Sequence, residues 1–293
     1  MAQSRYVILQ DRGVLAITGP DRATFLQGLV SNDTARVSAE RAMYAALLTP
    51  QGKYLHDFFM VENGEAIWLD AEAARLDDLK RRLSIYRLRA KVTLEERADL
   101  AVAAVFGGEA FGLPGEAGVA LALDGGIAFT DPRLPALGAR TVLPRETMRS
   151  TLTAAGATET DFAEYDGLRL SLGVPDGSRD LVLDKSILLE SGFDELNGVD
   201  WDKGCYIGQE LTARTRYRGL IKKRLFPVRI DGPAPEPGAI VTHDGQEAGE
   251  MRSSRDGIGL ALLRLEAVSK AETLQSGSSS IVPLKPDWMR LPD

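Results

Sequence analysis

The chain has 293 residues and a formal charge of −7, from 35 Lys and Arg against 42 Asp and Glu. Hydrophobic residues make up 44% of it and charged residues 26%, which is typical of folded globular proteins and excludes wholesale disorder. Cys205 is the only cysteine, and His56 and His243 are the only histidines. These counts exclude an internal disulfide, a CxxC redox pair and a self-contained zinc site.

The first residues contain no long apolar stretch followed by small residues, so no secretory signal is predicted. No apolar run approaches the ~20 residues that a membrane helix needs. We therefore expect a cytoplasmic protein that is monomeric alone and has no membrane partner. The negative charge argues against direct nucleic-acid binding through the whole surface.

The first 90 residues alternate short strands with two helices. Pro20 and Asp21 suit a first helical turn, because proline pre-sets φ and an acid favours the positive end of the helix dipole. Apolar residues repeat at helical spacing from there to residues 31–33, and again over residues 71–86. Strands are predicted at residues 6–9, 14–18, 43–48, 55–61 and 66–69. This order favours an α+β fold over a doubly wound parallel sheet.

Residues 92–142 continue with a strand-like pattern, and helices are predicted at residues 145–155 and 161–172. The mixed segment 174–204 is too long for a plain connection, so it is interpreted as an ordered functional loop.

The C-terminal part is predicted to be a small β-barrel or sandwich, because the turn-rich residues 231–238 are followed by short strands. The strands expected are 239–242, 248–251 and 258–262, with residues 275–280 as a flexible loop. We expect an α+β region over residues 1–225, with interleaved subdomains at about 1–95 and 96–225, and a barrel over residues 226–293.

The most informative segment is Lys203-Gly-Cys-Tyr-Ile-Gly-Gln-Glu210. Gly204 and Gly208 permit a tight turn and a close backbone approach around Cys205. Lys203 places a positive charge two residues from the thiol, and a helix that begins after Gly208 would favour the thiolate further. The pattern indicates a reactive or metal-binding thiol with Lys203 as its cation. A buried cysteine that only fills space is the alternative.

These eight residues match the KGCYxGQE signature of the YgfZ family of folate-binding iron–sulfur cluster biogenesis proteins. The sequence resembles the α-proteobacterial and mitochondrial branch of that family. The similarity follows the chain in order, through residues 19–33, 48–53, 211–214, 223–227, 257–263 and 286–289.

The resemblance implies the α+β fold of the glycine-cleavage T-protein, with antiparallel subdomains around a central folate-binding cavity and a small C-terminal β-barrel. It implies that the family depends on the thiol of Cys205. The residues that frame it in the motif are Lys203, Gly204, Tyr206, Gly208, Gln209, Glu210 and Arg214.

Folate contacts are implied for two residues. Asp57 stands where the aminomethyltransferase relatives keep a carboxylate, and Asn32 matches the family's helix-ending Asn-Asp pair. Ser171 departs from the transferases, which carry a pterin-binding glutamate at that position. A solvated Asp at a strand edge is the alternative for Asp57.

Three further residues have two interpretations each. Glu190 follows an apolar run and would need a partner if buried, so it is a candidate pterin contact. Trp201 could stack on a flat ligand or pack in the core. His56 is interpreted as a structural imidazole rather than a ligand.

Residues 214–224 contain six cationic residues and no acid. They could bind the anionic tail of a folate, a phosphate backbone or an acidic partner protein. A solvated, charged strand is the alternative.

We therefore expect an accessory factor for the assembly of 4Fe–4S proteins rather than an enzyme, with tetrahydrofolate or a derivative as cofactor. Cys205 would supply one ligand to a transient cluster shared with an A-type carrier. Client 4Fe–4S enzymes would be further partners and would link the protein indirectly to tRNA thiomodification. The alternatives are a tetrahydrofolate-dependent one-carbon transferase, with Asp57 as acid–base group, and an RNA-binding factor.

Overall fold

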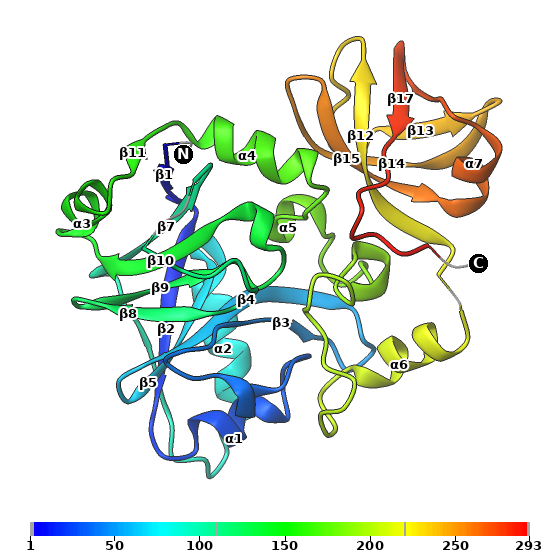
Figure 1. Ribbon diagram of the computed structural model, residues 1–293. Coiled ribbons are helices and arrows are strands. Elements are labelled where there is room, and N and C mark those ends of the chain that lie inside the picture. The colour runs from blue at the N-terminus through cyan, green and yellow to red at the C-terminus, as the bar shows by residue number, and fades with distance from the viewer. Residues whose placement is uncertain (1–2, 109–110, 220, 292–293) are drawn as a thin grey trace. The chain divides into compact units, whose positions relative to one another are not determined.

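The computed structural model describes residues 3–108, 111–219 and 221–291, which form two compact units (Figure 1). The first unit comprises Met1–Leu48, Leu55–Phe162 and Leu196–Ile207, and the second comprises Thr49–Tyr54, Ala163–Glu195 and Gly208–Asp293. Neither unit is one continuous stretch of chain. The motif 203–210 contains the last point along the chain, between Ile207 and Gly208, at which the first unit ends and the second resumes.

Two β-sheets form the framework of the first unit. Their strands are β1 (Arg5–Ile8), β2 (Arg12–Thr18), β3 (Met43–Leu48), β4 (Tyr54–Asn63), β5 (Ala66–Glu72), β6 (Thr93–Glu96), β7 (Leu100–Phe106), β8 (Ala120–Leu123), β9 (Gly126–Thr130), β10 (Ala139–Pro144) and β11 (Thr158–Glu159). One sheet has the order β3-β4-β5-β2-β6 and the other has the order β11-β1-β7-β10-β9-β8. β1 runs parallel to β11 and antiparallel to β7, and β2 runs antiparallel to β5.

Helices of the first unit cover these sheets with apolar side chains. They are α1 (Arg22–Gln27), α2 (Leu76–Ile85) and α3 (Met148–Ala154), with the 3₁₀ turns η1 (Thr34–Arg36), η2 (Ala73–Arg75) and η3 (Pro135–Leu137). α2 buries Leu76, Leu79 and Leu83, a stripe at i, i+3 and i+7. These leucines share one core with Leu15 and Ile17 of β2. The same core includes α1, whose end positions the candidate site.

The helix predicted over residues 71–86 is too long at its start. β5 continues to Glu72, and Ala71 pairs with Gly13 of β2. A 3₁₀ turn follows, and α2 begins only at Leu76. A buried alanine fits the apolar period of a helix as well as that of a strand, so the pairing with β2 decides the assignment.

The second unit contains a closed six-stranded barrel. Its strands are β12 (Lys223–Asp231), β13 (Ile240–His243), β14 (Gln246–Arg255), β15 (Ile258–Arg264), β16 (Leu274–Ser276) and β17 (Ser279–Pro283), in the order β12-β15-β14-β13-β16-β17. The helices are α4 (Phe162–Ser171), α5 (Gly177–Asp180), α6 (Gln209–Tyr217) and α7 (Leu265–Lys270), with the 3₁₀ turn η4 (Leu188–Ser191). The boundary expected near residue 225 falls inside β12.

The flexible loop predicted at residues 275–280 is wrong, because these residues form the β16–β17 hairpin. Leu274 and Ile281 are buried and paired across it. Ser276 and Ser279 are also buried, and their hydroxyls donate to the carbonyl oxygens of Ile240 and Pro233. Serine-rich composition resembles a linker, but here backbone carbonyls satisfy the hydroxyls and allow them to be buried.

A buried ionic cluster joins α4 and α5 to the barrel within the second unit. Asp166 accepts hydrogen bonds from Arg169, Arg179 and Arg255. Burial alone would raise the pKa of Asp166, but the hydrogen bond from Arg179 and the charge of Arg169 lower it to about 2. Arg169 also bonds Asp180, at 2.8 Å. The carboxylate of Asp166 therefore links α4, α5 and β14.

His56 is a structural histidine, as the sequence indicated. It lies buried on β4, and its Nε2 is 2.8 Å from an Asp78 carboxylate oxygen on α2. Burial lowers the pKa of His56 to about 4, and the charge of Arg75 acts in the same direction.

We expect the free energy of unfolding to decrease as the pH falls from 6.5 to 4. The unfolded histidine titrates near 6.5 and the folded one at about 4, so the unfolded chain binds more protons in this window, a loss of up to about 3 kcal/mol. Urea denaturation at several pH values measures it. His56→Gln should flatten this part of the profile, and His243→Gln should leave it unchanged. An equal slope in His56→Gln would contradict the assignment.

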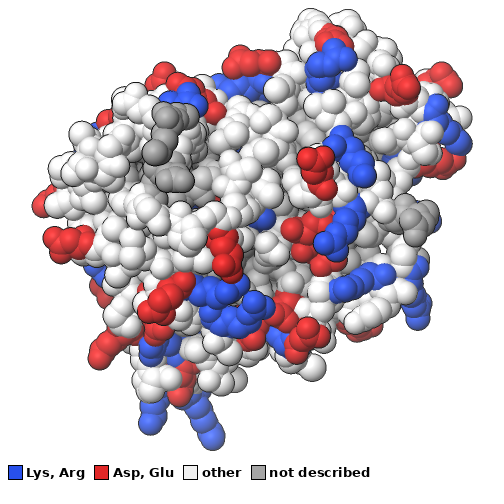
Figure 2. All heavy atoms as spheres, in the orientation of Figure 1, with Lys and Arg blue, Asp and Glu red and all other residues white. Residues whose placement is uncertain are grey.

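The surface carries charges of both signs. Figure 2 shows Lys and Arg interspersed with Asp and Glu over the face that it draws. Among the described residues, no helix is both long enough and apolar enough to cross a membrane.

Candidate functional site

The segment Leu196–Ile207 carries Cys205 and is hydrogen-bonded to the residues that follow α1. Ser31 Oγ donates to the Gly198 carbonyl at 2.6 Å, and the Asp200 amide donates to the Ser31 carbonyl at 3.0 Å. Near the other end, the Ile207 amide donates to the carbonyl of Gly28 at 3.2 Å. Both ends of the segment are therefore held, so the residues between them have a defined path.

Lys203 holds the middle of this segment. Its Nζ donates to the carbonyl oxygens of Gln27, Val30 and Asn32, at 2.9, 2.6 and 2.7 Å. These carbonyls lie at and beyond the end of α1, where a cation is favoured by the helix dipole. Burial lowers the pKa of Lys203 to about 8, so the amine is mostly protonated at neutral pH.

The structure thus changes the interpretation of Lys203. The sequence suggested a free cation beside the thiol, but an ammonium group has three donors, and all three are used by backbone carbonyls. Its Nζ also lies 5.1 Å from the centre of the Tyr206 ring. Lys203 therefore positions the segment that carries the sulfur.

Cys205 is exposed, in a stretch without helix or strand. Gly204 beside it has open space, since a Cβ added there would meet no atom within 4 Å, so the tight approach expected of this glycine is absent. Among the described residues, no group of three or more His, Cys, Asp or Glu side chains is placed to hold a metal ion. In this part of the chain Cys205 is therefore a single, accessible thiol.

The rest of the motif begins α6 in the second unit. Gly208 has φ 80° and precedes the first helical residue, Gln209, so a left-handed residue is required there. The turn before Tyr54 packs closely on this start. A Cβ at Gly52 would lie 2.6 Å from the Leu211 Cβ and 2.7 Å from the Gly208 carbonyl oxygen. Gln209 is half-buried, and Glu210 and Arg214 are exposed.

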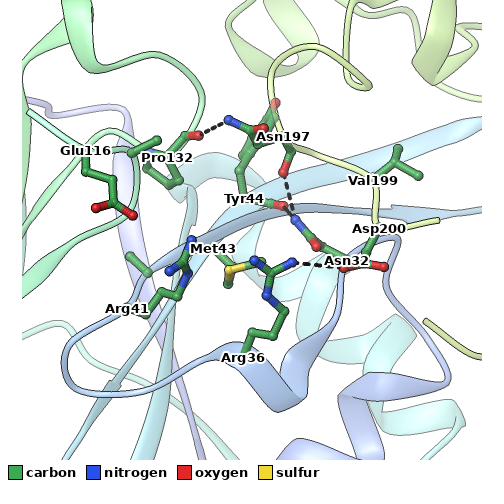
Figure 3. Close-up of a pocket in the computed structure, with 12 residues that line it drawn as sticks. Asn32, Arg36, Arg41, Met43, Tyr44, Glu116, Pro132, Asn197, Val199 and Asp200 are labelled. Atoms are coloured by element: carbon green, nitrogen blue, oxygen red, sulfur yellow. Dashed lines mark hydrogen bonds and ion pairs between the residues drawn. The ribbon is translucent and has the colours of Figure 1, made fainter. Parts of the chain in front are cut away.

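A pocket of about 250 Å³ lies in the first unit, beside the start of the Leu196–Ile207 segment (Figure 3). Its polar lining residues are Asn32, Arg36, Arg41, Tyr44, Glu116, Asn197 and Asp200. The Asn32 amide nitrogen donates to the carbonyls of Tyr44 and Asn197, both at 2.7 Å. Cys205 is not among the lining residues.

Two arginines give the pocket its chemical character. Figure 3 shows the Arg36 and Arg41 side chains entering from the segment that precedes β3. Arg36 is paired with Asp200 at 3.1 Å. The Nε of Arg41 is buried and has no hydrogen-bond partner among the described residues. A buried donor without a partner is costly, so this atom lacks an acceptor that a bound ligand would supply.

Asp57 lies one hydrogen bond behind this pocket. It is buried on β4, and its carboxylate accepts a hydrogen bond of 2.9 Å from the hydroxyl of Tyr44, a pocket-lining residue. Burial and the Asp57 charge raise the pKa of Tyr44 well above its usual range. The solvated strand-edge position considered for Asp57 is wrong, because its side chain is buried and bonded to Tyr44.

A buried ionic cluster supports this region from within the core. Asp70 accepts a hydrogen bond of 2.7 Å from Arg12 and one of 2.6 Å from Arg140. The guanidinium of Arg140 lies 4.1 Å from the centre of the Phe59 ring, and that of Arg133 lies 4.8 Å from it. Arg133 also contacts the ring of Tyr44, at 5.6 Å. The cluster therefore continues from Asp70 to the pocket wall.

The other predicted ligand contacts are distributed between the units. Trp201 is half-buried in the Leu196–Ile207 segment. Glu190 lies in η4 of the second unit, where burial raises its pKa and the charges of Lys223 and Lys53 oppose the rise. Ser171 donates from its hydroxyl to the Leu168 carbonyl of its own helix, at 2.7 Å.

Sequence reasoning missed several pocket residues. These are Tyr44, Arg36, Arg41, Glu116 and Asn197. Only Asn197 had a local signal, since Asn-Gly is a typical turn dipeptide and Asn197 has φ 55°. The others come from separate loops and strands, so no spacing in the chain could have related them.

Comparison with known proteins assigns the chain to a family. It is 37% identical to the mitochondrial iron-sulfur cluster assembly factor IBA57 of Homo sapiens and 35% identical to that of Mus musculus. Each alignment covers 96% of this chain and 84% of the relative. The chain belongs to the IBA57 family. Within it, residues 222–291 match the CAF17 C-terminal beta-barrel domain.

The fold predicted from the resemblance is confirmed. The structure superposes on the glycine cleavage system aminomethyltransferase T of Bartonella henselae with a TM-score of 0.78, over 97% of this chain and 85% of that chain. The sequence identity is 16%, so this likeness concerns the fold. This chain thus combines T-protein-like α+β sheets with a closed C-terminal barrel.

The expected cytoplasmic location is corrected by the same comparison, because the IBA57 relatives are named as mitochondrial. The expectation rested on a missing secretory signal and a missing membrane helix. Neither feature distinguishes the cytoplasm from the mitochondrial matrix.

Proposed function

We propose that this protein is an accessory factor in iron–sulfur cluster assembly that lends Cys205 as one ligand to a cluster shared with a carrier protein. The observation that carries the proposal is an exposed thiol on a segment held by Lys203, in a chain whose relatives are named iron-sulfur cluster assembly factors. Those names favour a non-enzymatic role.

A shared cluster follows from the ligand count. Protein-bound iron–sulfur clusters usually take four thiolate ligands, and this chain has one cysteine. The remaining ligands must come from the carrier, for which an A-type iron–sulfur protein is the partner we propose. Client 4Fe–4S enzymes, including those of tRNA thiomodification, and the wider relation to YgfZ proteins belong to the same proposal.

A folate is the proposed cofactor, and the pocket of the first unit suits part of one. Its volume, about 250 Å³, is below the ~300–1,000 Å³ of drug-sized sites, so it would take one end of the molecule. Arg41 Nε could donate to a carboxylate or a pterin oxygen, and Asn32 and Asn197 also line the pocket. Tetrahydrofolate would carry one-carbon units if it reacts.

Replacing Cys205 by serine tests the ligand role. The wild-type protein mixed with a cluster-loaded A-type carrier should develop a thiolate-to-iron absorption band that the carrier alone lacks, because one ligand changes. Cys205→Ser should lose this band. Gly204→Ala is the matched control, since its new methyl group meets open space. An unchanged band in Cys205→Ser would exclude the ligand role.

A second arm of this experiment separates the assembly role from one-carbon transfer. Turnover of formaldehyde equivalents to tetrahydrofolate that collapses in Asp57→Asn would favour the transferase. We expect no such turnover, because Ser171 replaces the transferase glutamate and its hydroxyl is bonded within its own helix.

A further inference from the structure

A cationic surface follows Cys205 along the chain, at the end of α6. Arg214 and Arg218 are exposed and lie at i and i+4, so they are neighbours on the helix surface. Tyr217, at i+3 from Arg214, is 76% exposed, and Lys222 is exposed directly before β12. We call Arg214, Tyr217, Arg218 and Lys222 the α6 surface.

These three cations lack the ion pairs that other helical cations have. Arg81 and Arg82 of α2 both pair with Asp78, and Lys270 of α7 pairs with Glu266. Across the described residues, no ion pair is formed by Arg214, Arg218 or Lys222. Like charges at i and i+4 destabilise a helix. The helix dipole favours cations at a C-terminal end, but α2 and α7 have paired cations in the same position.

Arg216 is also exposed, and the other two cations of residues 214–224 have structural contacts. Arg224 is buried and paired with Glu195 at 2.8 Å, and Lys223 is half-buried near Glu190. The inward side chains of α6 are Thr212 and Thr215. The segment is therefore not a solvated charged strand. It divides into an inward, structural part and the outward α6 surface.

We infer that the α6 surface docks an acidic patch of a partner protein, and this inference rests on the proposed function, in which the partner is the cluster carrier. Unpaired cations match an anionic partner surface. Arg and Tyr are enriched at protein interfaces and among their strongest contacts. Gln209, where α6 begins, follows Cys205 by four steps along the chain, a reach of at most ~14 Å.

An acidic protein fits these observations better than RNA does. Single-stranded RNA is bound by a cationic groove with several aromatic side chains for stacking, and the α6 surface has one aromatic residue and three cations. The protein as a whole also carries a charge of −7, which opposes a long polyanion. A local acidic patch needs only local complementarity.

The test measures binding of the full-length protein to the cluster-free A-type carrier by calorimetry, at low and moderate salt. Arg214→Glu combined with Arg218→Glu should weaken binding about tenfold and reduce its salt dependence. Arg87→Glu combined with Arg89→Glu is the matched control, because both arginines are exposed and the change in net charge is equal. The control should bind within twofold of wild type.

Arg214→Gln combined with Arg218→Gln removes the charges without reversing them, and we expect a smaller loss in the same direction. Circular dichroism and thermal melting check that each variant is folded. Docking is measured with the cluster-free carrier, and the ligand role of Cys205 is measured with the cluster-loaded carrier. Cys205→Ser should therefore still bind the cluster-free carrier. Three results would overturn the inference. They are equal weakening in both charge-reversed double variants, unchanged binding in the Arg214→Glu and Arg218→Glu double variant (the α6 pair), and no binding by the wild-type protein. Competition by tRNA or by a folate polyglutamate, lost in the α6 pair alone, would assign the surface to that ligand instead.

Discussion

Asp70→Asn should lower the free energy of unfolding by about 3–5 kcal/mol, because it leaves two buried guanidinium groups without their shared counter-charge. Asp70 is 2% exposed, and its partners Arg12 and Arg140 are 7% and 3% exposed. Burial alone would raise the pKa of Asp70, but the charges of Arg12 and Arg140 lower it, so the carboxylate is ionised in the folded protein. Asparagine has the same shape but only one acceptor oxygen. Its amide N–H groups would face the N–H groups of the arginines.

Urea denaturation of the wild type and the variant measures the Asp70 effect. Asp99→Asn is the control, since Asp99 pairs with Arg97 at the surface and an exposed pair contributes about 0–1 kcal/mol. The Tyr44 ring packs beside the same cluster through Arg133, so we also expect weaker tetrahydrofolate binding. A loss below about 1 kcal/mol in Asp70→Asn would show that water reaches the arginines.

Lys203→Met should release the segment that carries Cys205. Three backbone carbonyls would lose a charged donor, and methionine fills similar space without replacing the hydrogen bonds. Hydrogen bonds to a charged group each contribute ~1.5–3 kcal/mol when fully buried. Lys203 is half-buried, so water can replace part of this contribution. We therefore expect the free energy of unfolding to decrease by about 2–3 kcal/mol.

Limited proteolysis reports the local part of this change. Cleavage within Leu196–Ile207 should become faster in Lys203→Met, and the cluster-dependent absorption band should weaken although Cys205 is present. Lys222→Met removes the same side chain from an exposed position and should leave proteolysis and stability as in wild type. If the segment stays resistant in Lys203→Met, the backbone bonds of Ser31 and Ile207 are sufficient to hold it.

The motif 203–210 shows how far local sequence reaches. Its glycines, its thiol and the start of α6 after Gly208 could be read from the chain, because turn preference and helix starts depend on neighbouring residues. The partners of Lys203 could not be predicted from the chain. The three carbonyls that it binds come from residues 27–32, far away in the chain, and a lysine two residues from a cysteine suggests a local pair instead.

The serine-rich hairpin and the pocket mark the same limit. Residues 275–280 have the composition of a loop, and their place in the barrel depends on the carbonyls of Pro233 and Ile240. The pocket residues Arg36 and Arg41 have no pattern of their own, and they matter because folding places them beside Tyr44 and Asn197.

One thiol in 293 residues determined by itself that this protein has no disulfide and no complete set of cysteine ligands, since a count does not depend on folding. The sequence also determined the α+β order of elements and the β-rich C-terminal part, because periodicity and turns are local. Only the tertiary structure decided that Cys205 is exposed, that Lys203 holds its segment, and that Asp57 lies behind Tyr44. Burial and hydrogen-bond partners are set by residues distant in the chain, so they exist only once the chain has folded.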